Sequence, residues 1–176
     1  MIQKSQAIVL HYIKYSDTSI ILHAYTEAYG RVNFMVQGLR RKNSRMKINM
    51  FQPLFILDLE MHYKEKRQLQ KIREARNAFP YQTIPQDFRK TGIALFIAEL
   101  LHKCLQEEEA NPGLYQFIVN NLKVFDLKTS GLANFHLYFM THLTKYLGFI
   151  PQNNYDESHI YFDSLKGRFS PFRPLH

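Results

Sequence analysis

The sequence predicts an α+β protein with two domains, a five-stranded β-barrel of the OB type followed by an α-helical domain. Short β-branched and apolar stretches separated by turn residues run to about Phe79 and are typical of strands. From Ile84 onward, apolar residues recur at helical spacing. The net charge of +8 lies entirely in residues 1–79, which carry 14 Lys and Arg against 6 Asp and Glu, because residues 80–176 carry 9 of each. We therefore expect domains at 1–79 and 80–176, the second one incomplete at its C-terminal end.

Five segments of the first domain have strand character. The first two are β-branched and apolar, and the polar turn Lys14–Thr18 separates them. The third and fourth alternate in polarity, as strands with one buried face do. The expected strands are residues 6–13, 19–26, 31–37, 54–62 and 69–75. Five short antiparallel strands are few for a sandwich and fit a small, partly open OB barrel, a fold whose exposed face and loops bind oligonucleotides.

Three helices are expected in the second half. The first begins near Asp87, and Asn111 followed by proline marks the start of the second. Ser130 is the expected N-cap of the third helix, and Gly148 is placed to end it in a left-handed conformation. Three such helices form a bundle without net charge.

A basic loop follows the third strand. Five cations and no acidic residue lie within residues 40–47. We interpret this stretch as a loop that follows a phosphate backbone, where Lys and Arg displace condensed counterions. The alternative is a solvated loop that only keeps the protein soluble. The candidate DNA contacts are the cations of this loop and of the neighbouring strands and turns: Arg31, Arg40, Arg41, Lys42, Arg45, Lys47, Lys64, Lys66, Arg67, Lys71 and Arg73.

Aromatic residues accompany these cations. The chain has no Trp but 14 Phe and 11 Tyr. Single-stranded nucleic acid is held by stacking of its bases on aromatic side chains beside a cationic groove. Tyr15, Tyr29 and Tyr63 are candidates for such stacking, and packing at the rim of the barrel is the alternative for each.

The residues show no catalytic or metal-binding pattern. A P-loop, a G-x-S-x-G sequence and an H-E-x-x-H sequence are all missing. The eight histidines lack the spacing of metal ligands, and the single Cys104 excludes an internal disulfide and a multi-cysteine zinc site. We interpret Glu107–Glu109 as a solvated helix end. No apolar run has the length of a membrane span and no secretory signal is recognisable, so we expect a cytosolic protein without enzymatic activity, metal or cofactor.

Several short motifs occur together in an order and spacing that hold over about fifty residues. They are Ile8–Leu10, Tyr15–Ser19, Tyr25–Glu27, Gly30–Val32, Gly38–Arg41, Ser44–Arg45 and Gln52–Leu54. This set resembles the N-terminal domain of the bacterial DNA repair and recombination mediator RecO. Asn111–Tyr115 and Leu147–Phe149 are similar to the second half of the same family.

The resemblance implies a non-enzymatic, nucleoid-associated bacterial protein. It implies binding of single- and double-stranded DNA, annealing of complementary strands, and RecA loading together with RecR. It also implies contact with the acidic C-terminal tail of single-stranded-DNA-binding protein, for which Lys123 and Lys145 beside apolar helix faces are our candidates. Family members often have arginine where Ala133 and Asn134 stand, and many carry a four-cysteine zinc module where residues 151–168 contain no cysteine. We therefore expect a weakened tail contact and no zinc.

Without the resemblance, the charge pattern leaves two further interpretations open. One is a protein-interaction adaptor whose basic loop binds an acidic partner. The other is an RNA-binding OB protein. No membrane partner is expected, because the sequence contains no basic amphipathic helix.

Overall fold

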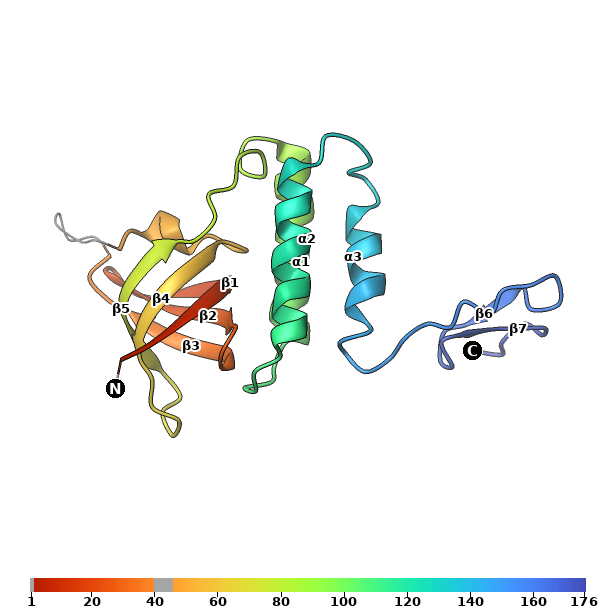
Figure 1. Ribbon diagram of the computed structural model, residues 1–176, viewed down its shortest axis with the longest axis horizontal. Helices are drawn as coiled ribbons and strands as arrows, with labels where there is room; N and C mark the ends of the chain where they lie inside the picture. The colour runs from red at the N-terminus through yellow and green to blue at the C-terminus, as the bar shows by residue number, and fades with distance from the viewer. Residues whose placement is uncertain (1, 40–45) are drawn as a thin grey trace. The chain divides into compact units, whose positions relative to one another are not determined.

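A computed structural model, which describes residues 2–39 and 46–176, contains a β-barrel, three helices and a terminal hairpin (Figure 1). The structure divides into two units, Met1–Ala133 and Asn134–His176. The first unit contains the barrel and two helices, and the second contains the third helix and the hairpin. The elements are β1 (Ile2–Ser16), β2 (Ser19–Thr26), β3 (Gly30–Val36), the 3-10 helix η1 (Ile48–Phe51), β4 (Ile56–His62), β5 (Gln70–Asn77), α1 (Phe88–Cys104), α2 (Pro112–Leu127), α3 (Phe135–Leu143), β6 (Tyr161–Asp163) and β7 (Arg168–Ser170).

The barrel strands follow the order β1-β2-β3-β5-β4, and the ring is closed. The predicted OB-type barrel followed by helices is therefore confirmed, although we expected a partly open barrel. Closure depends on β1, which pairs with β2 on one side and with β4 on the other. Its register shifts between Val9 and His11 and again near Ser16, and such irregularities bend a strand. A short parallel pairing of Phe34 and Met35 with the start of β5 completes the ring.

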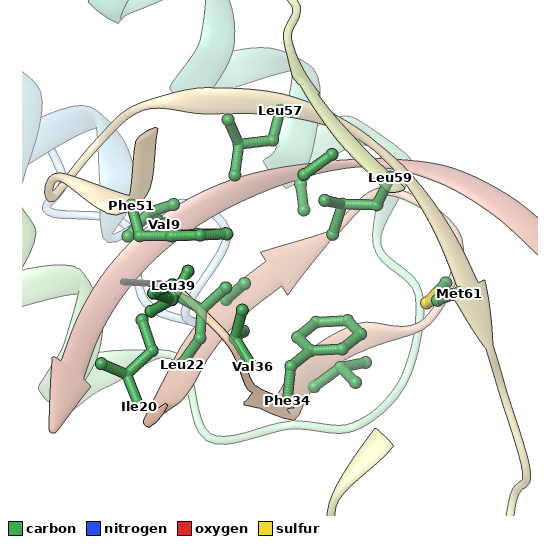
Figure 2. Packing of buried hydrophobic residues seen from close by; sticks show 14 residues of the cluster. Val9, Ile20, Leu22, Phe34, Val36, Leu39, Phe51, Leu57, Leu59 and Met61 are labelled. Carbon is green, nitrogen blue, oxygen red and sulfur yellow. The ribbon is translucent and has the colours of Figure 1, made fainter. Parts of the chain in front are cut away.

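Alternating side chains of all five strands fill the barrel. Figure 2 shows 14 residues of this apolar cluster, among them Val9, Leu22, Phe34 and Leu57, each of which is fully buried. Removing one such side chain from water contributes about 1.5–3 kcal/mol to folding. The core therefore fixes which strand faces point outward and so places the surface residues of the barrel.

A buried carboxylate connects the segment after the barrel to α2. Asp126 of α2 is fully buried and accepts hydrogen bonds from the backbone N–H groups of Gln82, Thr83 and Ile84 at 2.8–2.9 Å. Lys90 of α1 donates its Nζ hydrogen to the carbonyl oxygen of Asp126 at 2.6 Å. These bonds hold the start of α1 against the end of α2.

The helix ends agree with the sequence for α1 and α2 but not for α3. Asp87 and Asn111 are N-caps whose side chains accept backbone hydrogen bonds, which agrees with the predicted helix start near Asp87 and the predicted cap at Asn111. The expected N-cap Ser130 is wrong, because α3 begins only at Phe135. Gly131 lies between them with φ of +64°, a left-handed conformation that interrupts a right-handed helix.

Candidate nucleic-acid interface

The barrel has two ends of different chemistry. β2 and β3 are antiparallel, with Ile20 opposite Val36 and Thr26 opposite Gly30. One end therefore carries the β1–β2 turn together with Leu39, whose N–H donates to the carbonyl oxygen of Thr18 at 3.1 Å. We call this the Leu39 end. The Gly30 end, at the other extremity of β2 and β3, carries the β2–β3 turn.

The Leu39 end is where the predicted basic loop starts and returns. Arg40, Arg41, Lys42 and Arg45 lie outside the described residues. Lys47 is exposed and extended, immediately before η1.

An apolar hollow lies at the same end. Tyr12, Ile20, Leu39 and Ile48 line a cavity of about 320 Å³ together with the residues of the β1–β2 turn. Tyr15, a candidate for base stacking, is 65% exposed in this part of the barrel. The Leu39 end thus offers apolar and aromatic surface beside the start of a basic segment, as base stacking requires.

At the Gly30 end, Arg31 contacts α1 directly. Its Nη1 donates hydrogen bonds to the carbonyl oxygens of His102 and Leu105, both at 2.7 Å. Carbonyl groups at the C-terminal end of a helix have no partner within the helix, and a cation there also interacts favourably with the helix dipole. Burial lowers the pKa of Arg31. The structure therefore places this predicted DNA contact at the junction between the barrel and α1.

Three histidines surround that junction. The ring centroids of His11, His23 and His102 are 5.0–6.2 Å apart. Nη2 of Arg31 lies 3.2 Å from Nδ1 of His102, and Nδ1 of His23 lies 2.6 Å from Oδ1 of Asn33. Burial, with a further contribution from the Arg31 charge, lowers the pKa of His102 to about 4, and burial also lowers the pKa of His23. The arrangement favours the neutral imidazole at His23 and His102.

Sequence reasoning missed this histidine cluster because its members come from β1, β2 and α1, far apart in the chain. The only sign of the cluster in the sequence was that His11 and His23 fall on two consecutive expected strands. Within residues 2–39 and 46–176, no group of three or more His, Cys, Asp or Glu residues is suited to hold a metal ion.

The candidate stacking residues Tyr29 and Tyr63 contact each other at the Gly30 end. Their ring centroids are 4.1 Å apart and the ring planes differ by 25°. Burial, followed by the charge of Glu65, raises the pKa of Tyr63. The pair connects the β2–β3 turn to the turn between β4 and β5, so one face of each ring is already covered.

The turn between β4 and β5 is held by Gln70. This side chain is almost fully buried, and its Nε2 donates to the carbonyl oxygens of Lys64 at 2.8 Å and Arg67 at 2.7 Å. Its Oε1 accepts from the N–H of Lys64 at 2.9 Å. The cationic side chains of Lys64, Lys66 and Arg67 therefore project from a turn of fixed backbone, and all three are exposed.

The cations of β5 differ from one another in their surroundings. Lys71 is exposed, whereas Nη1 of Arg73 lies 3.4 Å from a carboxylate oxygen of Glu60. Lys4 contacts the other oxygen of Glu60 at 3.1 Å. The outer face of β1, β4 and β5 therefore carries charges of both signs, which weakens its attraction for a polyanion.

The two candidate contacts for an acidic peptide belong to different units. Nζ of Lys123 on α2 lies 5.3 Å from the ring centroid of Phe79, a cation–π distance. Lys145 follows α3 in the second unit.

Comparison with known proteins identifies the class of this arrangement, an OB barrel joined to a helical region. The model of the recombination protein O N-terminal domain matches residues 1–81, and the model of its C-terminal domain matches residues 85–172. The chain is 40% identical to the DNA repair protein RecO of Bacteroides fragilis (strain YCH46) over 176 residues, which cover 99% of this chain and 72% of that protein. It is 36% identical to the RecO of Phocaeicola vulgatus, with 100% and 73% covered, and 38% identical to that of Flavobacterium psychrophilum, with 98% and 72% covered. The chain belongs to the RecO family.

Among residues 2–39 and 46–176, no helix is long and apolar enough to cross a membrane.

Proposed function

We propose that this protein binds single- and double-stranded DNA without sequence preference and acts as a non-enzymatic mediator of DNA repair and recombination. Its place of action would be the bacterial cytoplasm, where the chromosome lies. The observation that carries the proposal is the concentration of the whole net charge of +8 in the residues that build an OB barrel. A basic module attracts polyanions, and this barrel type presents loops that accept oligonucleotides.

The Leu39 end supports this activity better than the rest of the barrel. Its basic segment would neutralise phosphates, and the apolar hollow lined by Tyr12, together with the exposed ring of Tyr15, would receive unstacked bases. Base–aromatic stacking contributes about 1–3 kcal/mol per base and tolerates any sequence. Phosphate neutralisation and base stacking together would let the protein hold complementary strands and promote their annealing.

Fluorescence anisotropy with a labelled oligothymidylate tests the proposal on the full chain. If about four to six phosphates are neutralised, log K should fall with log salt at a slope of about −3 to −4, at roughly 0.7 per contact. A slope near zero would contradict DNA binding by counterion release. Competition with an RNA oligomer of matched length distinguishes a DNA mediator from an RNA-binding protein, since the latter would prefer the RNA.

The partners form the finer part of the proposal. We propose that the protein acts together with RecR to load RecA. We also propose that Lys123 and Lys145 contribute to contact with the acidic tail of single-stranded-DNA-binding protein. Titration with a peptide copying that tail should show binding at low salt that weakens in Lys123→Ala and Lys145→Ala. Unchanged binding in both variants would show that neither lysine contacts the tail. Lys103→Ala is the matched control. Lys103 is an exposed lysine on α1 and is not one of the two candidate contacts.

A further inference from the structure

The segment that connects α1 to α2 is attached to the Gly30 end of the barrel. The backbone N–H of Arg31 donates to the carbonyl oxygen of Glu107 at 2.9 Å. A Cβ atom at Gly30 would overlap the carbonyl oxygen of Glu109 and would lie 2.8 Å from that of Glu107. Only glycine permits this approach, and Gly30 also has φ of +61°.

This attachment fixes a run of three carboxylates beside the barrel. The side chains of Glu107, Glu108 and Glu109, which we call the acidic loop, are all exposed. Glu27 of the β2–β3 turn adds a fourth carboxylate, whose Oε1 accepts a hydrogen bond from Gln116 of α2 at 3.0 Å. The acidic loop is therefore held in place by backbone contacts while its charges face solvent.

Acidic and basic side chains meet across a small hollow at this end. Arg31, Lys66 and Arg67 line a cavity of about 140 Å³ together with Glu65 and Glu108. A phosphate that approached Lys66 or Arg67 here would also approach Glu108. Like charges within about 10 Å repel each other at ordinary ionic strength.

The field of the acidic loop reaches the aromatic pair as well. Burial and then Glu65 are the main causes that raise the pKa of Tyr63, and Glu108 contributes in the same direction. Burial and the charge of Glu107 raise the pKa of Tyr25 to about 12. The negative potential therefore covers the same end of the barrel as the cationic turn between β4 and β5.

We propose that the acidic loop keeps the phosphate backbone away from the Gly30 end and so confines bound DNA to the opposite end of the barrel. This inference rests on the proposed DNA binding and concerns the path of the strand. The cations Lys64, Lys66 and Arg67 then contribute little to affinity in the intact protein, because the acidic loop cancels their attraction for phosphate. The loop acts as a specificity element for where on the barrel DNA binds.

The experiment compares two variants of equal net charge. In Glu108→Gln/Glu109→Gln, the acidic loop loses two charges, and in Glu99→Gln/Glu157→Gln two exposed carboxylates are removed elsewhere. We expect the first variant to bind a labelled oligothymidylate about 3- to 10-fold more tightly at low salt, because a repulsion acting over one Debye length is removed. One or two added phosphate contacts should steepen its salt slope by roughly 0.7 each. The second variant should stay within about twofold of the unaltered chain.

A further pair of variants locates the effect. Lys66→Ala/Arg67→Ala should hardly change affinity in the unaltered chain, but should abolish the gain in the Glu108→Gln/Glu109→Gln background. Equal tightening by both glutamine variants would show an effect of net charge alone and overturn the inference. So would a large loss of affinity from Lys66→Ala/Arg67→Ala in the unaltered chain. Absence of DNA binding by the unaltered chain would instead refute the proposed function, and this inference with it.

Discussion

The two ends of the barrel use similar residues for different purposes. At the Gly30 end, Arg31 donates to backbone carbonyls of α1, and Tyr29 and Tyr63 stack on each other. At the Leu39 end, Tyr15 is exposed beside an apolar hollow. The role of a cation or an aromatic ring therefore depends on the groups that already surround it. One end of the barrel is a junction with helices, and the other carries the apolar hollow that we propose as part of the DNA site.

The largest effect on stability is expected at Gly30. Gly30→Ala should destabilise the protein by about 2–4 kcal/mol, because it adds strain at positive φ to overlap with the acidic loop. Urea unfolding measures the change.

Gly131→Ala is the matched control for Gly30→Ala. Gly131 has φ of +64°, but the nearest atom to an added Cβ is Cε of the flexible Lys128 side chain, at 3.5 Å. Only the strain of about 1 kcal/mol should remain there. Equal losses in the two variants would show that the contact with the acidic loop does not matter.

Arg31→Lys should be the next largest change. It keeps the charge but loses the paired hydrogen bonds to the carbonyls of His102 and Leu105, so we expect a loss of about 1.5–3 kcal/mol in urea unfolding. Arg73→Lys is the control, because its contact with Glu60 is a surface ion pair worth at most about 1 kcal/mol. An Arg31→Lys protein of unchanged stability would refute the junction role of Arg31.

A smaller effect on stability is expected from acid. The pKa of His102 is about 4 in the folded state against an ordinary value of 6.5, and that of His23 is lowered too. The unfolded chain therefore binds more protons, and stability that is fully present above pH 6.5 should be lost progressively as the pH falls toward 4. Carboxylates with lowered pKa values, such as that of Asp126, lose most of their contribution below pH 3.8, at the lower edge of this window.

Unfolding measured between pH 7 and 4 tests the histidine cluster. His102→Gln should flatten the pH dependence in this range, whereas His142→Gln in the second unit should leave it unchanged. If both variants retain the full pH dependence, the acid sensitivity originates outside the junction.

The smallest effect on stability belongs to the basic loop. Arg40→Ala/Arg41→Ala/Lys42→Ala should shift Tm by no more than about one or two degrees, because the sequence predicts solvated charges here and such charges contribute little to stability. The same variant should weaken DNA binding and reduce the salt slope by about 2, at roughly 0.7 for each of three lost contacts. An unchanged affinity would show that DNA does not follow this loop.

The sequence predicted the barrel well and the site unevenly. Alternation of apolar residues was sufficient to locate β3 and β4, because one face of each strand must fill the core. The N-cap of α3 was misplaced, since Ser130 has the right side chain but a left-handed glycine follows it. A proposed domain boundary near residue 79 stays a prediction.

The different roles of the candidate cations were beyond sequence reasoning. Arg31 and Lys47 look alike in a charge count, and only the position of α1 distinguishes them. The sequence likewise could not show which groups surround Glu107–Glu109, which we interpreted as a solvated helix end. Their side chains are indeed exposed, but the carbonyl groups of Glu107 and Glu109 lie against Gly30 across a separation of more than seventy residues. Backbone contacts between residues so far apart in the chain leave no pattern in the local sequence.

Lysine footprinting tests the central claim, that DNA binds at the Leu39 end and is excluded from the Gly30 end. The full chain is acetylated with and without a saturating oligothymidylate, and each modified lysine is quantified by mass spectrometry. We predict that DNA protects Lys14 and Lys47, which are exposed near the β1–β2 turn and η1, and leaves Lys64 and Lys66 as reactive as before. Protection of Lys64 and Lys66 without protection of Lys47 would contradict the account.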